Sequence, residues 1–190
     1  MTKVLVCGLG GIGSYFIQHI DRLIDSKQIN DYSFTCFDDD VVENKNILYQ
    51  NFEPGDIGML KTTALQFKFL NINYKTKRVD FNDLIQYNLI ILCADNNLIR
   101  RQTYDAFITN KIPFIDARAN GKTVGIFSSA TNNYLSTIDT SSTSQSCQNP
   151  FQIEKKQIEF GNVIIAAILT QIVLNFTRTS KLPNDLLLNI

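Results

Sequence analysis

Glycine and charged residues directly follow the short apolar runs of this chain. The first run, KVLVC at 3–7, leads into a turn in which Gly8, Gly10 and Gly13 fit the spacing G-x-G-x-x-G. Such glycines allow a tight turn and let the backbone approach a phosphate at a helix N-terminus. The motif is common, so by itself it indicates only a nucleotide or dinucleotide ligand.

An acidic segment follows the second apolar run, YSFTCF at 32–37. Asp38 stands where an acidic side chain binds ribose hydroxyls in dinucleotide-binding folds. Taken alone, the glycine turn and Asp38 favour an NAD-dependent oxidoreductase. The polar stretch that continues through Asp40, Glu43, Asn46 and Gln50 is longer than a ribose clamp requires. The extra length indicates that this polar segment does more than bind a ribose.

Two further charged residues suit phosphoryl or nucleotidyl transfer. Lys61 falls in the first turns of a predicted helix, where a cation opposes the helix dipole unless it faces an anion. Asp95 closes the buried run LIILCA at 89–94, and a carboxylate there is well placed to hold Mg²⁺. Arg100 lies one turn into the helix that follows. Hydride transfer needs neither the lysine nor the metal carboxylate, whereas phosphate chemistry uses both.

The elements that position these residues alternate between strand and helix. This order predicts an α/β fold: a doubly wound, Rossmann-like, mostly parallel sheet with helices on both faces. We expect an antiparallel strand to be added near the C-terminal part, through the turn at Asn120-Gly121. The remaining expected elements are an edge strand at 74–81, a helix at about 98–110, strands at 113–119 and 123–130, and a helix at about 157–177.

Composition restricts the function classes. The 190 residues predict one domain over 1–190, and the 18 basic and 18 acidic residues give no net charge to attract nucleic acid. The longest apolar stretch, 163–176, is too short for a membrane span and predicts a core or interface helix. The absence of a signal peptide or CxxC pair leads us to expect a cytoplasmic protein. The polar stretch 136–150 predicts a flexible crossover loop.

Four ordered motifs carry a family resemblance. They are GLGGIGS, DDDVVENKNILYQ, DIGMLK and CADNNLIR, and they fall within about residues 3–130. In this order the chain resembles the ThiF/MoeB/ubiquitin-activating superfamily, whose members are adenylyltransferases. SCQNPFQIEKKQIEFGNVIIAAIL is more loosely similar to the crossover loop and following helix of that superfamily.

The resemblance implies a reaction with ATP and Mg²⁺. The C-terminal glycine carboxylate of a small ubiquitin-like or sulfur-carrier protein attacks the α-phosphate, giving an acyl-adenylate and pyrophosphate. It also implies a homodimer, or a heterodimer with another family member. The residues carried over by motif are Gly8, Gly10, Gly11 and Gly13 along the phosphates, Asp38 on the ribose, Asp40 in the acidic pattern, Asn46 and Lys61 on the triphosphate, Asp95 on Mg²⁺, Arg100 of the DNxxxR pattern, and Cys147 as a thioester or persulfide carrier.

The chain departs from the family pattern in two places. Tyr49 stands where the family keeps an arginine against the ATP phosphates, and tyrosine carries no charge at pH 7. The first strand begins at Lys3, which leaves no room for the N-terminal helix that supplies a second arginine. Three hypotheses therefore stay open: an active adenylyltransferase, a weakly active or inactive ATP-binding partner subunit, and an NAD-dependent oxidoreductase.

Overall fold

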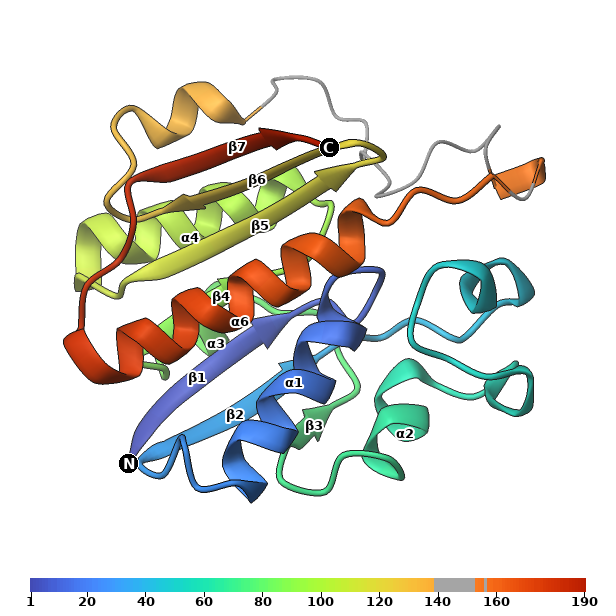
Figure 1. Ribbon diagram of the computed structural model, residues 1–190. Helices are drawn as coiled ribbons and strands as arrows, with labels where there is room; N and C mark the ends of the chain where they lie inside the picture. Colours follow the sequence, from blue (N-terminus) through green and yellow to red (C-terminus); the bar gives the residue numbers. More distant parts are fainter. Residues whose placement is uncertain (139–152, 156) are drawn as a thin grey trace.

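The sheet is the centre of the molecule in this computed structural model, which describes residues 1–138, 153–155 and 157–190 (Figure 1). Seven strands lie in the order β3-β2-β1-β4-β5-β6-β7. The first five are parallel, and β6 and β7 are antiparallel to their neighbours. The strands are β1 Thr2–Cys7, β2 Tyr32–Phe37, β3 Asn73–Lys75, β4 Leu89–Leu92, β5 Phe114–Asn120, β6 Thr123–Ser128 and β7 Asp185–Asn189.

Helices cover both faces of the sheet (Figure 1). On one face α1 and α6 pack together over the strands, and on the other α3 and α4 do. The helices are α1 Gly13–Asp25, α2 Lys61–Gln66, α3 Phe81–Leu84, α4 Asn97–Asn110 and α6 Gly161–Thr179, with 3-10 turns η1 Asn44–Leu48, η2 Pro54–Asp56 and η3 Tyr134–Thr137. The doubly wound, Rossmann-like fold expected from the sequence is confirmed.

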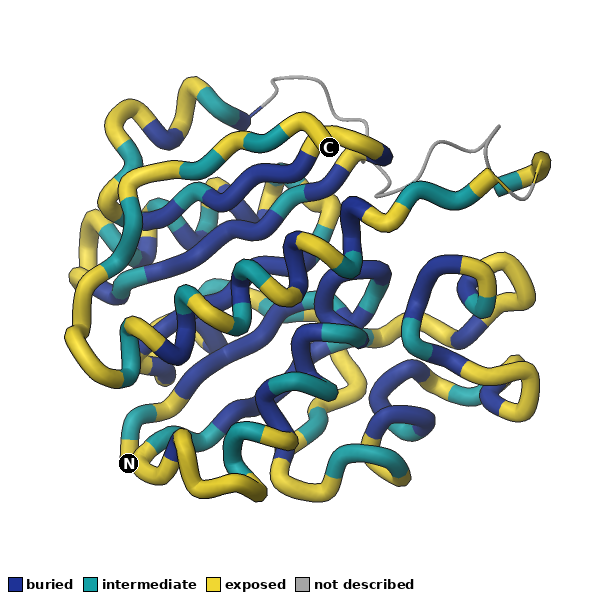
Figure 2. The backbone as a smooth tube through the Cα atoms, viewed as in Figure 1, coloured by how far each residue is buried: buried dark blue, intermediate teal, exposed yellow. Residues whose placement is uncertain are grey.

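The central strands are buried on both faces (Figure 2). All four residues of β4 are fully buried, as expected for an apolar strand of a parallel sheet. The parallel register pairs Cys7 with both Phe37 and Leu92, so the strands β1, β2 and β4 end side by side. Every residue that follows these strand ends therefore comes to one edge of the sheet.

Two elements differ from the expectation. The edge strand predicted at 74–81 is limited to β3, which ends at Lys75. Asp80, at the end of the predicted strand, instead accepts a hydrogen bond from the backbone N–H of Asp83 and caps the short helix α3. The strand β7 was not predicted. It pairs antiparallel with β6, so two strands rather than one extend the sheet in the antiparallel sense.

The last helix also begins later than expected. The helix predicted from about 157 starts at Gly161 and ends at Thr179. Of the predicted crossover loop, Ser136 and Thr137 belong to η3 and Ile138 is buried, whereas 139–150 lie outside the described residues.

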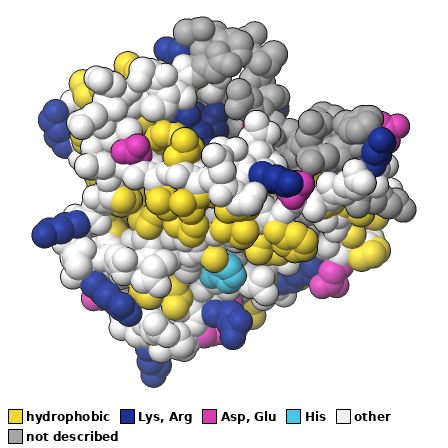
Figure 3. Space-filling view, turned by 45° about the horizontal axis from the view of Figure 1, so that its top comes forward, with side chains coloured by type: hydrophobic (Ala, Val, Ile, Leu, Met, Phe, Trp, Pro, Cys, Tyr) yellow, Lys and Arg dark blue, Asp and Glu magenta, His cyan; other side chains and the backbone are white. Residues whose placement is uncertain are grey.

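Helix α6 is long and apolar enough, by length and composition, to cross a membrane. It packs on the sheet, however, and Ile165, Leu169 and Val173 are fully buried in the core. This packing agrees with the core or interface helix expected from the sequence. A band of hydrophobic side chains crosses the outer face (Figure 3). His19, the single histidine of the sequence, lies beside this band and contacts Thr170 of α6.

The start of α6 offers a test of the packing. A Cβ on Gly161 would lie 2.1 Å from the carbonyl oxygen of Gly121, in the turn between β5 and β6. We expect Gly161→Ala to lower the free energy of unfolding by about 1–3 kcal/mol, as overpacking does. Gly55→Ala, where a Cβ meets nothing within 4 Å, is the control and should change it by less than about 0.5 kcal/mol. Urea unfolding measures both, and equal stabilities would contradict the contact.

Candidate nucleotide site

The glycine turn, Gly8 to Gly13, joins β1 to α1 and is closely packed against neighbouring backbone. Gly8 has a φ of +94°, and a Cβ there would lie 3.1 Å from the backbone of Cys93 and Ala94. A Cβ on Gly13 would lie 2.0 Å from the carbonyl oxygen of Gly8. The N-terminus of α1 can therefore approach the strand end only because these positions are glycine.

Asp38 connects this turn to the end of β2. Its Oδ2 accepts the backbone N–H of Leu9 at 2.6 Å, and its Oδ1 accepts that of Asp40 at 2.9 Å. Burial raises the pKa of the Asp38 carboxyl, while Lys61 and the two N–H donors oppose that shift. The carboxylate thus fixes the glycine turn at the place where the sequence predicts ribose binding.

The acidic loop after β2 folds back onto the start of α2. The Lys61 ammonium lies 2.7 Å from Asp40 Oδ2, and the Lys61 backbone N–H donates to the Asp40 carbonyl. Asn46 accepts the N–H of Glu43, closing the cap of η1. The anion that Lys61 was expected to face is, in the protein itself, the Asp40 carboxylate.

A cavity of about 280 Å³, called the first cavity below, is lined by most of the residues predicted to bind the nucleotide. Its lining includes Gly8, Gly10, Gly11, Asp38, Asp40, Asn46, Lys61 and Asp95, together with Glu43, Lys45, Tyr49, Gln50, Cys93 and Ala94. These residues come from the ends of β1, β2 and β4 and from η1 and α2. Their convergence follows from the parallel register of the three strands.

A second cavity, of about 310 Å³, adjoins the first. Gly8, Asp38, Asp40, Ala94 and Asp95 line both cavities. The second one adds an apolar wall of Phe37, Val79, Leu98 and Ile99. One polar and one partly apolar chamber, joined at Asp38, suit a ligand with phosphates at one end and a base at the other.

One buried polar atom of the first cavity has no partner. Gln50 is 7% exposed, and its Oε1 finds no hydrogen-bond donor among the described residues. The Gln50 side chain faces the glycine turn, since a Cβ on Gly10 would lie 4.0 Å from its Nε2. Buried polar atoms are nearly always satisfied, so this oxygen is available to a water molecule or a ligand in the cavity.

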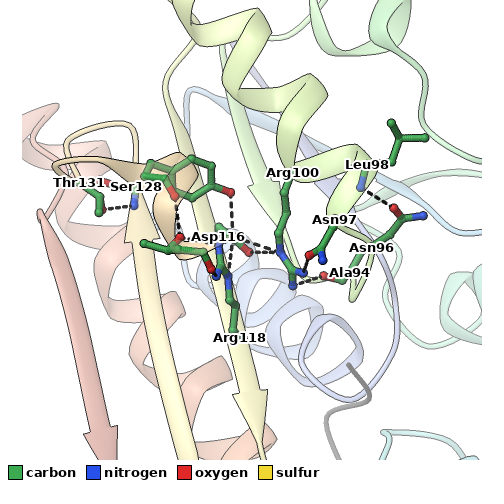
Figure 4. A network of polar contacts seen from close by, with 11 residues as sticks. Ala94, Asn96, Asn97, Leu98, Arg100, Asp116, Arg118, Ser128 and Thr131 are labelled. Carbon is green, nitrogen blue, oxygen red and sulfur yellow. Dashed lines mark hydrogen bonds and ion pairs between the residues drawn. The ribbon is translucent and has the colours of Figure 1, made fainter. Parts of the chain in front are cut away.

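Three predicted residues lie elsewhere. Gly13 packs beneath the turn and does not line the cavity. Arg100 donates to the Ala94 carbonyl at 2.8 Å and lies 3.2 Å from Asp116, so it supports the segment that carries Asp95 (Figure 4). Cys147 lies outside the described residues.

The charge that holds Arg100 was missed from the sequence. Asp116 is fully buried on β5 and also accepts hydrogen bonds from Arg118 Nε, at 2.8 Å, and from the Tyr134 hydroxyl, at 2.8 Å (Figure 4). Arg118 donates in turn to the carbonyl of Thr137 in η3. The run PFIDARA indicated a strand, and the period of two puts Asp116 and Arg118 on one face of it. Nothing in the run indicates the contacts of Asp116 with Arg100 and Tyr134, which lie on other elements.

Asn162 is a second residue that the sequence did not reveal. It is 1% exposed at the start of α6, and its Nδ2 donates to the carbonyls of Gly11, at 3.1 Å, and Tyr49, at 2.5 Å. It therefore ties the glycine turn and the end of η1 to α6. The only signal was a lone polar residue at the beginning of an apolar run.

One carboxylate at the cavities, that of Asp95, suits the implied metal ion. Among the described residues no group of three or more His, Cys, Asp or Glu side chains gathers to hold a metal. Mg²⁺ needs less, since proteins commonly bind it through one or two carboxylates plus substrate phosphates. Asp95 is exposed at the junction of the two cavities and fits that arrangement.

The parallel sheet, the glycine turn and the acidic end of β2 define a Rossmann-like domain of the nucleotide-binding type. A model of the ThiF family matches residues 1–187, so the chain belongs to the ThiF family. The superfamily resemblance seen in the sequence is thereby confirmed. No curated protein matches the sequence.

Solved structures share the fold. A PaaA crystal structure superposes with a TM-score of 0.71 at 18% identity, covering 100% of this chain and 61% of its own. Escherichia coli MccB with MccA superposes with a TM-score of 0.70 at 19% identity, covering 100% of this chain and 60% of the MccB chain. MccB with ATP superposes with a TM-score of 0.66 at 19% identity, covering 96% of this chain and 57% of the MccB chain. The chain therefore spans about three-fifths of the length of these structures.

The Asp116 cluster should stabilise the site strongly. Asp116→Asn removes the carboxylate that two buried or partly buried arginines share. We expect the free energy of unfolding to fall by about 3–5 kcal/mol, the cost of leaving buried charges unpaired. Asp39→Asn breaks the exposed pair with Arg78 and should cost less than about 1 kcal/mol. Urea unfolding compares the two, and similar losses would contradict the assignment.

The strand cysteines should be chemically inert. Burial raises the pKa of the Cys7 thiol to about 12, Asp38 adds to the shift and Arg100 opposes it; burial also raises the pKa of Cys36. The reactive thiolate is therefore scarce at pH 8. We expect iodoacetamide to leave Cys7 and Cys36 unmodified in the native protein and to alkylate both in urea, as measured by peptide mass spectrometry. Native alkylation of either would contradict this.

Proposed function

We propose that this chain is an ATP-dependent adenylyltransferase that activates a carboxylate. The observation that carries the proposal is the first cavity, where the glycine turn, Asp38, Lys61 and Asp95 share one lining at the ends of three parallel strands. The ThiF family match supports it, as does the solved MccB structure with ATP.

In the proposed reaction a carboxylate oxygen of the acceptor attacks the α-phosphorus of ATP. A new bond forms between that oxygen and phosphorus, and the bond to the β-phosphate oxygen breaks and releases pyrophosphate. Negative charge grows on the leaving oxygens, so a fixed cation near them lowers the barrier. Lys61, which is buried and held by Asp40, is such a cation.

The other residues position the nucleotide. The backbone of Gly8, Gly10 and Gly11 leaves room for phosphates beside the start of α1. Asp38 binds the ribose where the two cavities meet, and Asn46 contacts the triphosphate from η1. Mg²⁺, held by Asp95 and phosphate oxygens, would neutralise charge on the phosphates. Arg100 positions the Asp95 segment through the Ala94 carbonyl.

The proposed acceptor is a small ubiquitin-like or sulfur-carrier protein with a C-terminal glycine. Solved MccB structures contain MccA, which supports a small acceptor in more general terms. A cytoplasmic location and a homodimer or heterodimer with another family member are included in the proposal. The hydrophobic band along α6 is the surface that suits a partner chain (Figure 3).

A second function is favoured by one observation. Tyr49 is 7% exposed in the cavity wall where the family pattern has an arginine, and Arg100 is engaged with Asp116 and Ala94. A weakly active or inactive ATP-binding partner subunit would need fewer cations. The NAD-dependent oxidoreductase is the least supported alternative, because hydride transfer makes no use of Lys61 or Asp95.

Calorimetric titration and isotope exchange separate these functions. We expect ATP to bind and NAD not to bind, and a small protein ending in Gly-Gly to start Mg²⁺-dependent ATP–pyrophosphate exchange. Lys61→Met and Asp95→Asn should each lower the exchange rate by about 100-fold or more. The exposed controls Lys181→Met and Asp105→Asn should not lower it.

The other outcomes assign the other functions. Tight NAD binding without ATP binding would identify an oxidoreductase. ATP binding with exchange only after a second ThiF family protein is added would identify the partner subunit. Full exchange in both site variants would overturn the residue assignment.

A further inference from the structure

The first cavity carries more negative than positive charge. Its lining contains two ammonium groups and four carboxylates: Lys45 and Lys61, and Asp38, Asp40, Glu43 and Asp95. A triphosphate brings further negative charge into the same space. Each ammonium group on the wall therefore has a large effect on whether ATP binds.

Lys61 is a fixed cation. Its side chain is 7% exposed, its Nζ lies 2.7 Å from Asp40 Oδ2, and its backbone N–H donates to the Asp40 carbonyl. Both ends of the residue are thus held by one loop position. The Lys61 ammonium is therefore held beside Asp40 in this structure.

Lys45 is held much more loosely. It projects from η1, and its Nζ lies 2.9 Å from Glu43 Oε2, with the two side chains 53% and 59% exposed. Exposed ion pairs of this kind contribute little free energy. The Lys45 ammonium can therefore leave Glu43 for an anion of higher charge at small cost.

The same wall of the first cavity holds further polar groups beside Lys45. The hydrogen bond to Glu43 raises the pKa of Lys45, and Tyr49 beside it adds to the shift. The next residue, Gln50, has the buried Oε1 without a partner among the described residues. Lys45, Tyr49 and Gln50 line the first cavity but not the second. This wall therefore lies on the side of the first cavity away from the apolar wall of the second.

We propose that Lys45 is a second phosphate-binding residue, which exchanges Glu43 for the phosphates of ATP beyond the α-phosphate. The inference rests on the proposed adenylation function and adds the residue that supplies the charge Tyr49 does not. Glu43 then acts as a competitor that holds the ammonium when the cavity has no nucleotide. In this role Lys45 and Glu43 have opposite effects on ATP affinity.

The opposite effects distinguish ligand binding from a structural clamp. Lys45→Met should weaken ATP binding about ten- to a hundredfold, as expected for the loss of a charged hydrogen bond. Glu43→Gln keeps the cap of η1 but frees the ammonium, so it should tighten ATP binding about two- to fivefold. If the pair only held the loop together, both variants would weaken binding alike.

Calorimetry with ATP and AMP, in Mg²⁺ buffer and without any acceptor, measures these affinities. AMP lacks the phosphates that Lys45 contacts, so its dissociation constant should change less than about twofold in either variant. Lys45→Arg should keep most of the ATP affinity, and the exposed Lys181→Met is the matched control. In the Lys45→Met background the gain from Glu43→Gln should shrink.

The results separate the two proposals. If the wild-type chain binds neither ATP nor AMP, the proposed function fails. If the wild-type chain binds ATP and Lys45→Met binds it equally well, only the role of Lys45 is overturned. Equal losses for Lys45→Met and Glu43→Gln, or equal losses of ATP and AMP affinity, also overturn that role.

Discussion

The contact between Gly13 and the carbonyl of Gly8 is the constraint on which the site depends. Only a residue without a side chain lets α1 begin this close to the end of β1, because a Cβ would meet the Gly8 carbonyl oxygen at 2.0 Å. The approach brings Gly8 against the backbone of Cys93 and Ala94, at the end of β4. The glycine turn and the segment that carries Asp95 are thus held against each other by one close steric contact.

The acidic residues after β2 have separate roles, although the sequence shows them as one cluster. Asp38 accepts two backbone N–H groups, Asp39 pairs with Arg78, Asp40 with Lys61 and Glu43 with Lys45. Opposing partners therefore relieve the repulsion among neighbouring carboxylates. The partners of these four side chains differ in exposure, from the buried Lys61 to the exposed Arg78. The four carboxylates therefore differ in how easily they can give up a contact within the protein.

Most of the sheet could be predicted because apolar runs and turn residues are local signals. The strand at 32–37 appears where the sequence indicated, and the strand predicted at 123–130 forms over 123–128. Lys61 and Asp95 line one cavity, where neighbouring parallel strands end together. The short strand β7 was missed, since its pairing depends on β6 rather than on its own pattern. The helix α3 was hidden because one capping aspartate outweighs the strand pattern around it.

Contacts between distant residues set the limits of sequence reasoning at the site. The Arg100–Asp116 and Arg118–Thr137 contacts join three elements, and no spacing motif encodes them. Arg100 could be singled out from the sequence because its DNxxxR motif is local, whereas its partner Asp116 lies on another element.

Asn162 has a consequence for how the chain folds during synthesis. Its bonds to Gly11 and Tyr49 span 151 and 113 residues of sequence. An N-terminal portion emerging from the ribosome can form β1, α1 and β2, but these two bonds wait until α6 is made. Contacts of such high sequence separation form late and slowly. The first cavity therefore depends on contacts with the last third of the chain, which is synthesised after the strands that frame the cavity.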